Sequence, residues 1–329
     1  MTDLLIFGLG LFLLIGGAWV LISGGTRVAA VLGLPPVVVG LTVVAFGTSA
    51  PELFVSILGA VDGSTGLVLG NVIGSNVANL GLILALAAIL RPVIVEKGLS
   101  RNEVPFMFVA TIVFAAMIWD GTLSRLESGF LVLGFVVFIF WTFRNRDQEA
   151  VVGVAAKPEA PGPEKSRARE LGLGTGLVLL GVVGLAGGGH FIVGAATNIA
   201  VGFGISETLI GLTLVAIGTS LPELATTIVA ASRDEDDLAL GNIVGSNLFN
   251  ILAVAGPVGV FWELSIDGPQ VPLTHVFLHP SAFQVQLLSM FLLALLVLVM
   301  IVLGKGRIGR KRGLLLLSVY LLIMAIWTT

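Results

Sequence analysis

The sequence predicts an all-α integral membrane protein whose ten transmembrane helices form two inverted five-helix repeats. Three observations predict this fold class: a strongly apolar composition, a duplicated sequence, and a one-sided distribution of Lys and Arg. Of the 329 residues, 56% are hydrophobic and only 11% are charged, whereas soluble domains carry about 25% charged residues. The mean hydropathy of +1.07 agrees with a chain that lies mostly in lipid.

The composition also excludes several classes of function. The 17 Lys and Arg are balanced by 20 Asp and Glu, so no basic surface is expected to bind nucleic acid. The chain has no cysteine, which excludes disulfides, thiolate nucleophiles and Cys-ligated metal centres. No GxxxxGK[ST] motif occurs, so ATP hydrolysis by this chain is not expected. Any transport must therefore be driven by an ion gradient.

Ten apolar segments are long enough to cross a bilayer, which takes roughly 20 residues of helix. The first begins MTDLLIF, without a basic region before its apolar stretch, so we expect it to be retained rather than cleaved as a signal peptide. The predicted spans are 4–26, 36–60, 66–90, 104–119, 128–143, 171–200, 208–231, 238–261, 283–303 and 313–328.

Lys and Arg are concentrated in alternate loops between these spans. Sixteen of the 17 basic residues lie in one set of loops, and only Arg125 lies in the other. Because short cytoplasmic loops carry an excess of Lys and Arg, the set with sixteen is predicted to face the cytoplasm. Both termini are then outside. We therefore expect a multi-pass protein of the cell (inner) membrane.

The chain repeats itself at an offset of 171 residues. GLTVVAFGTSAPEL (40–53) matches GLTLVAIGTSLPEL (211–224) at eleven of fourteen positions, and GNVIGSNVAN (70–79) matches GNIVGSNLFN (241–250). Each half holds five predicted spans, an odd number, so the second copy must enter the membrane with reversed polarity. Inverted repeats are typical of secondary transporters, whose substrates bind near the midplane.

The repeats define the predicted domain organisation. Residues 1–143 form the first five-helix repeat and 171–329 form the second, inverted one. Between them, 144–170 is a charged, Pro-containing segment that cannot bury a core. It is predicted to be a cytoplasmic linker, too short for a regulatory domain, which takes at least about 50 residues.

Two acidic residues fall inside the predicted spans, Glu52 and Glu223, at equivalent positions of the repeat. An unpaired carboxylate at bilayer depth costs about 2.5–3.5 kcal/mol, and intramembrane ionisable groups are usually functional. No predicted span contains Lys or Arg to pair with them. The pattern therefore predicts that a cation supplies the missing positive charge.

The neighbours of each glutamate are rich in oxygen. Ala45, Thr48, Ser49 and Glu52 share one helix face, and Pro51 should bend the helix and free main-chain carbonyls in the preceding turn. Ala216, Thr219, Ser220, Glu223 and Pro222 repeat this pattern, and Ser75 with Asn79 and Ser246 with Asn250 form i,i+4 pairs. Oxygen ligands without nitrogen or sulfur are typical of hard cations, with Ca²⁺ favoured over Mg²⁺.

The paired motifs GTSAPE with GNVIGSNVAN and GTSLPE with GNIVGSNLFN resemble the α-repeats of the cation/calcium exchanger superfamily, most closely its prokaryotic-type sodium/calcium exchangers. The resemblance implies the sodium/calcium exchanger fold and antiport of Ca²⁺ against Na⁺ by alternating access. It also implies roles for the matching residues. Glu52 and Glu223 are the implied carboxylate ligands; Thr48, Ser49, Ser75, Thr219, Ser220 and Ser246 supply hydroxyls, Ala45 and Ala216 carbonyls, and Asn79 and Asn250 line the middle of the site.

The chain departs from many members of that superfamily at Asn79 and Asn250, since one of these positions often carries an aspartate. With Asn at both, K⁺ dependence is not expected, and the two glutamates balance one Ca²⁺ or two Na⁺.

A Ca²⁺/H⁺ antiporter stays an alternative, with His190 as a candidate proton carrier, and a cation channel is another. An enzyme is not expected, because the spans lack a Ser with a Lys or His partner. The expected partners are Ca²⁺ and Na⁺, with H⁺ in the alternative antiporter, and the lipid bilayer. No cofactor, nucleic acid or oligomer is required.

Overall fold

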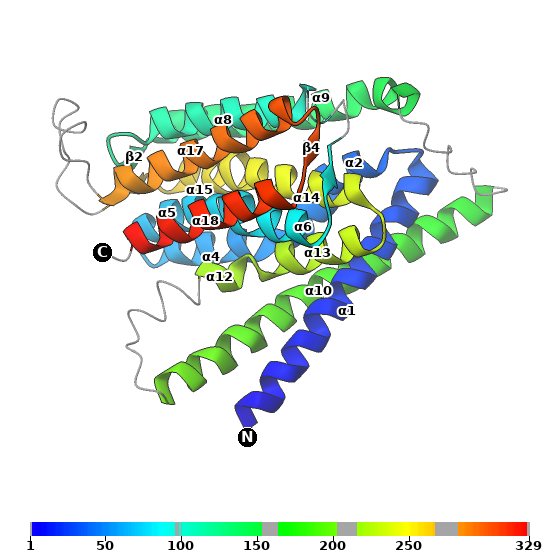
Figure 1. Cartoon of the computed structure of the whole chain (residues 1–329), viewed down its shortest axis with the longest axis horizontal. Helices are drawn as coiled ribbons and strands as arrows, with labels where there is room; N and C mark the ends of the chain where they lie inside the picture. Colours follow the sequence, from blue (N-terminus) through cyan, green and yellow to red (C-terminus); the bar gives the residue numbers. More distant parts are fainter. Residues whose placement is uncertain are drawn as a thin grey trace. The chain divides into compact units, whose positions relative to one another are not determined.

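The structure is a computed structural model that describes residues 2–95, 99, 101–152, 164–202, 216–266 and 282–327. Within these residues the regular structure is helical apart from two short antiparallel strand pairs (Figure 1). β1 (Val93–Ile94) pairs with β4 (Arg307–Ile308), and β2 (Thr122–Leu123) pairs with β3 (Leu264–Ser265). The predicted helical character of the chain is confirmed.

The helices of the first half follow the order of the predicted spans. They are α1 (Thr2–Leu32), α2 (Pro36–Val39), η1 (Gly40–Val44), α3 (Ala45–Thr48), α4 (Ala50–Val61), α5 (Thr65–Ala78), η2 (Asn79–Ile83), α6 (Leu84–Leu90), α8 (Glu103–Met117) and α9 (Arg125–Val152). Those named η are π-helical turns inside longer helices. Such turns are frequent at functional sites.

The helices of the second half repeat this order. They are α10 (Glu164–Gly202), α12 (Ala216–Thr219), α13 (Leu221–Ser232), α14 (Asp236–Leu248), η4 (Phe249–Ala255), α15 (Gly256–Phe261), α17 (Ala282–Leu303) and α18 (Arg310–Trp327). Residues 208–215, the start of the seventh predicted span, lie outside the described residues.

In the described part of the chain, six helical segments are long and apolar enough to cross a membrane, and the bent pair 36–61 makes a seventh. α8 and α13 are apolar but shorter. α9 and α10 extend beyond the predicted spans into the segment 144–170, to Val152 and from Glu164. The extension is physically reasonable because Arg, Gln, Glu and Ala favour helix, and the first proline of the segment is Pro158.

The predicted bend before Pro51 is confirmed. α3 and α4 meet at 44°, and Ser49 between them has left the helical conformation, with φ −86° and ψ 6°. Pro51 lacks an N–H and its ring cannot sit beside a regular preceding turn. Ser220, between α12 and α13 and just before Pro222, has nearly the same φ of −88° and ψ of 3°. The duplicated sequence therefore produces a duplicated helix break.

The chain divides into two compact units, Met1–Pro51 with Phe140–Gly245 and Glu52–Ile139 with Ser246–Thr329. Each unit thus combines segments from both halves of the sequence. In the second unit, α18 packs on α6 and η2. The ring of Tyr320 fills the space beside Gly81, where an added Cβ would lie 2.8 Å from the ring.

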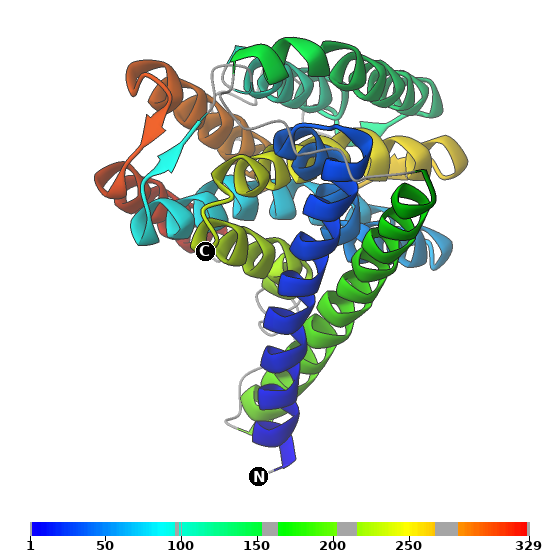
Figure 2. The same cartoon turned by 90° about the vertical axis from the view of Figure 1, so that its right-hand side faces the viewer.

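In the first unit, α1 and α10 run side by side (Figures 1 and 2). Glycines spaced seven residues apart line the contact on both helices. An added Cβ at Gly17 would lie 2.7 Å from the backbone nitrogen of Leu185, and one at Gly188 would lie 2.6 Å from that of Leu14. The antiparallel glycine pairs, called here the glycine seam, are Gly10 with Gly188, Gly17 with Gly181, and Gly24 with Gly174.

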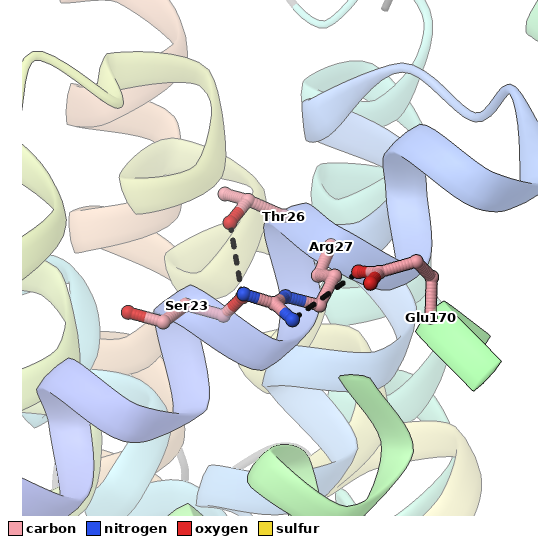
Figure 3. A network of polar contacts seen from close by, with 4 residues as sticks. All are labelled: Ser23, Thr26, Arg27 and Glu170. Atoms are coloured by element: carbon pink, nitrogen blue, oxygen red, sulfur yellow. Dashed lines mark hydrogen bonds and ion pairs between the residues drawn. The ribbon is translucent and has the colours of Figure 1, made fainter. Parts of the chain in front are cut away.

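Polar contacts hold both ends of the same helix pair. Arg27 of α1 and Glu170 of α10 form an ion pair with a 3.2 Å separation (Figure 3). Towards the other end, Asn198 donates a hydrogen bond to Asp3 over 3.1 Å. Between these contacts the glycines bring the two backbones close together, and larger side chains such as Leu21, Leu177 and Ile192 pack beside them, so the two helices form one closely packed pair.

The glycine seam leads to a stability prediction. Gly17→Ala should destabilise the protein by about 1–3 kcal/mol, because its Cβ would overlap the α10 backbone. Gly16→Ala is the matched control, since nothing lies within 4 Å of an added Cβ there and alanine favours helix. Thermal unfolding of both purified variants in detergent measures the difference. Equal melting temperatures for the two variants would contradict this packing.

Candidate cation-binding site

The two intramembrane glutamates of the sequence are both buried, each with 1% of its surface exposed. Glu223 lies in the first turn of α13, just after the break at Ser220. Its Oε1 accepts a hydrogen bond from the Ser49 hydroxyl at 3.0 Å. Since Ser49 stands at the break in the first copy of the motif, the fold brings a hydroxyl of one copy to the carboxylate of the other.

Asn242 organises the hydroxyls in the same unit. The Thr48 hydroxyl donates to Asn242 Oδ1 at 3.1 Å, and Asn242 Nδ2 donates to the Thr227 hydroxyl at 3.2 Å. Asn242 and Thr227 are fully buried. With one hydrogen bond accepted and one donated, the amide sets the direction in which the Thr48 hydroxyl points.

The second unit contains the equivalent amide, Asn71. Its Nδ2 donates to the Ser56 hydroxyl at 3.1 Å and to the main-chain carbonyl of Glu52 at 3.2 Å. Ser56 and Asn71 correspond to Thr227 and Asn242 at the repeat offset. Both copies of the motif thus use an asparagine of the GNxxGSN sequence to hold a hydroxyl one turn beyond the glutamate.

Further amides are buried beside the π-helical turns of the second unit. Asn250 Nδ2 donates to Asn76 Oδ1 at 3.1 Å, and Asn76 Nδ2 donates to the carbonyl of Asn247 at 3.4 Å. Asn250 Oδ1 and both polar atoms of Asn79 are buried without a hydrogen bond from the described residues. Leaving such a group without a partner costs about 1–3 kcal/mol, so these amides are suited to bind water or an ion.

Three more of the predicted ligands are buried serines. Ser75, Ser246 and Ser220 have at most 4% of their surface exposed, and the Ser220 hydroxyl has no hydrogen-bond partner among the described residues. Thr219 and Ala216 belong to α12. The bend does not free the Ala45 carbonyl, because it accepts the Ser49 N–H at 2.9 Å. The Thr48 hydroxyl lies 3.3 Å from the same carbonyl, but when it donates to Asn242 instead the carbonyl keeps one lone pair.

The roles of four asparagine side chains were not predicted from the sequence. Asn71, Asn76, Asn242 and Asn247 stand in the duplicated GNxxGSNxxN motif, but only its last asparagine was taken as a site residue. Identical residues in both copies were the available signal. Glu103 stands just before the predicted span 104–119, and in the structure it begins α8 with 1% of its surface exposed.

The duplicated motifs therefore place oxygen donors in the protein interior: carboxylates, hydroxyls, amides and main-chain carbonyls. This donor set suits a cation that prefers oxygen, such as Ca²⁺ or Na⁺. It supplies neither a nucleophile with a base nor a set of imidazole ligands, which hydrolytic metal sites normally use.

The chain is similar in sequence to proteins of a known family. The sequence profile of the family described as "Sodium/calcium exchanger protein" matches residues 2–144 and 173–329. The chain is 36% identical to the inner membrane protein YrbG of Escherichia coli, over 81% of each chain. It is 31% identical to the sodium/calcium exchanger MaX1 of Methanosarcina acetivorans, over 80% of this chain and 85% of that protein.

A solved structure has the same fold. The sodium-calcium exchanger NCX_Mj, soaked with 10 mM Na⁺ and zero Ca²⁺, superposes with a TM-score of 0.81 at 30% sequence identity and 98% coverage of both chains. This similarity confirms the predicted fold class.

The role of Asn242 leads to a second prediction. Asn242→Ala should weaken cation binding about 10- to 100-fold, the usual effect of removing a group that orients ligands, because the Thr48 hydroxyl loses its side-chain acceptor and can then donate only to the Ala45 carbonyl. Isothermal titration of the purified protein with Ca²⁺ measures the change. Asn198→Ala removes an exposed amide contact instead, and its affinity should stay within a factor of about two of the original protein. Equal affinities for the two variants would exclude this role for Asn242.

Proposed function

We propose that this chain, which belongs to the sodium/calcium exchanger protein family, is a secondary antiporter that exchanges Ca²⁺ for Na⁺ by alternating access. The observation that carries the proposal is the buried Glu223 carboxylate, held by the Ser49 hydroxyl of the other motif copy. The names of relatives support it, since MaX1 is a sodium/calcium exchanger and NCX_Mj structures were soaked with Na⁺, Ca²⁺ and Sr²⁺.

The balance of charge supports these two ions. Glu52 and Glu223 are the acids within the predicted spans, which contain no Lys or Arg. Two carboxylates are neutralised by one Ca²⁺ or by two Na⁺, so either load offsets the cost of burying them. A protein that changes access only with one Ca²⁺ or two Na⁺ bound never exposes the uncompensated charge of its two glutamates to lipid. This restriction couples the movement of one ion to that of the other.

The proposed ligands are the twelve residues of the duplicated motifs. Glu52 and Glu223 bind the ion through carboxylates; Thr48, Ser49, Ser75, Thr219, Ser220 and Ser246 through hydroxyls; Ala45 and Ala216 through carbonyls; and Asn79 and Asn250 through side-chain amides. The Asn250 Oδ1 atom and the Asn79 amide, buried without hydrogen bonds from the described residues, support this assignment.

We further propose a location in the cell (inner) membrane with both termini outside. The Lys and Arg distribution supports this orientation, and the related YrbG is an inner membrane protein. α1 and α10 are the proposed moving elements, because the glycine seam joins them to one another and small residues leave few side chains to interlock with neighbouring helices.

Ion flux in proteoliposomes tests the function. Uptake of ⁴⁵Ca²⁺ should require an outward Na⁺ gradient at constant pH and should not respond to a K⁺ gradient. Uptake driven by a pH gradient without Na⁺ would instead show a Ca²⁺/H⁺ antiporter, for which His190 is a candidate. Flux orders of magnitude faster than exchange, without saturation, would show a channel.

Removing either carboxylate should abolish transport. Glu52→Gln and Glu223→Gln each remove half of the proposed site's charge while keeping its shape, so Ca²⁺ uptake should fall at least about 100-fold, as for other essential charged ligands. Both variants should stay folded, because a neutral amide is cheaper to bury. Glu170→Gln, which alters a partly exposed ion pair, is the control and should transport normally. Near-normal exchange in either glutamate variant would refute the proposed site.

Asn250 offers a test of the site's middle. Asn250→Asp adds a negative charge next to Asn76, so Ca²⁺ uptake should become more sensitive to acidic pH or newly dependent on Na⁺ or K⁺ concentration. Asn250→Ala should only weaken ion binding. Initial uptake rates against pH, Na⁺ and K⁺ distinguish the two. Identical profiles for the original protein and Asn250→Asp would mean that position 250 does not contact the transported ions.

A further inference from the structure

A basic side chain joins α13 to α1 in the first unit. Arg233 follows directly after α13 and donates a hydrogen bond to the Ser23 hydroxyl of α1 at 2.9 Å. Its guanidinium carbon lies 4.7 Å from the centre of the Trp19 ring, one turn earlier on α1. Ser23 in turn donates to the Trp19 carbonyl at 2.7 Å. We call Arg233, Trp19 and Ser23 the α1–α13 contact.

The contact joins two elements with different roles. α1 is bound to α10 through the glycine seam, whereas α13 carries the buried Glu223. Glu223 and Arg233 are at opposite ends of the same helix, about 15 Å apart at 1.5 Å per residue. Any displacement of α1 along α13 must therefore break the hydrogen bond to Ser23 or the stacking on Trp19.

The internal repeat has no second copy of this contact. At the repeat offset, Arg233 corresponds to Asp62, Trp19 to His190 and Ser23 to Gly194. An acidic residue cannot make a cation–π interaction, and Gly194 offers no hydroxyl. The proposed ion-binding motifs are nearly identical in the two halves. The α1–α13 contact, in contrast, is a feature that the two halves do not share.

We propose that the α1–α13 contact is a latch that stabilises one of the two access states, so that Arg233 and Trp19 set how differently the two faces of the membrane bind Ca²⁺. The proposal rests on the proposed antiport. Two inverted repeats with identical contacts would give two states of similar stability. A contact present in one state and without an equivalent in the other shifts that balance, and the state it disfavours binds its ions with a lower apparent affinity.

The size of the effect follows from the interactions involved. A cation–π contact at a partly exposed site and a hydrogen bond from a charged group together should shift the ratio of the two states by about tenfold. Since the apparent dissociation constant scales inversely with the competent fraction, the change is large enough to measure in transport assays.

Chemical linking tests whether the contact must open. The chain contains no cysteine, so cysteines introduced at Ser23 and Arg233 can be joined selectively by a short bis-thiosulfonate, which forms a reducible disulfide with each thiol and releases sulfinate. Linking should lower Ca²⁺ uptake at least about tenfold relative to the unlinked double variant, and reduction should restore it. The control pair, at Arg27 and Glu170, joins α1 to α10, which already pack together, and should transport normally when linked.

Substitution tests the asymmetry. Arg233→Gln and Trp19→Leu should shift the apparent KM for Ca²⁺ in opposite directions on the two faces of the membrane, each by up to about tenfold, while Trp19→Phe should retain part of the effect. Arg27→Gln, which also removes a basic side chain near α1, should change neither value. A merely structural contact would alter stability or both KM values in parallel.

The outcomes separate this proposal from the proposed function. Full activity of the linked Ser23–Arg233 pair, or parallel KM changes in Arg233→Gln, would overturn the latch while leaving antiport intact. If the original protein shows no Na⁺-driven Ca²⁺ uptake, antiport itself fails. In that case hydrogen–deuterium exchange still tests the latch: Arg233→Gln should raise exchange in residues 19–26 of α1 more than Arg27→Gln does, and equal exchange would overturn it.

Discussion

The structure depends on one constraint: two carboxylates are buried in a membrane protein whose predicted spans contain no basic side chain. Burying an uncompensated charge is expensive, so each neighbouring feature serves to make the position tolerable. The helix breaks at Ser49 and Ser220 turn hydroxyls out of the regular helix, and one of these hydroxyls reaches Glu223. The asparagines orient further hydroxyls without adding charge. In the proposed antiport, a transported cation completes the balance.

Two kinds of packing serve this arrangement. Around the acids, α3, α13 and α14 are joined by directional hydrogen bonds, in which Asn242 connects Thr48 with Thr227. Between α1 and α10 the two backbones approach closely at the glycine seam. Directional bonds hold ligand atoms in place, whereas a surface of small residues has few side chains that must repack when a helix moves. The directional hydrogen bonds beside Glu223 and the close packing of α1 with α10 therefore come from different residues of the same unit.

The duplicated motifs make matching contacts in the two halves of the chain, whereas residues outside the motifs do not. Asn71 with Ser56 and Asn242 with Thr227 make the same contact in separate units, and both copies break their helix with nearly the same backbone angles. Outside the motifs the halves have diverged. Arg233 and Asp62 occupy equivalent positions with opposite charge, so the two halves cannot make the same contacts there.

The sequence alone determined the helical membrane fold, the duplication, the bend before Pro51 and the two glutamates that are buried, because hydrophobic length, an internal repeat and a proline act locally along the chain. It did not reveal the pairings that depend on packing. Thr48 and Asn242 are 194 residues apart, and Ser49 and Glu223 are 174 apart. The same is true of Gly16 and Gly17, which look equivalent in sequence although only Gly17 meets α10. Which face of a helix meets which neighbour is decided by tertiary packing, and only the structure shows it.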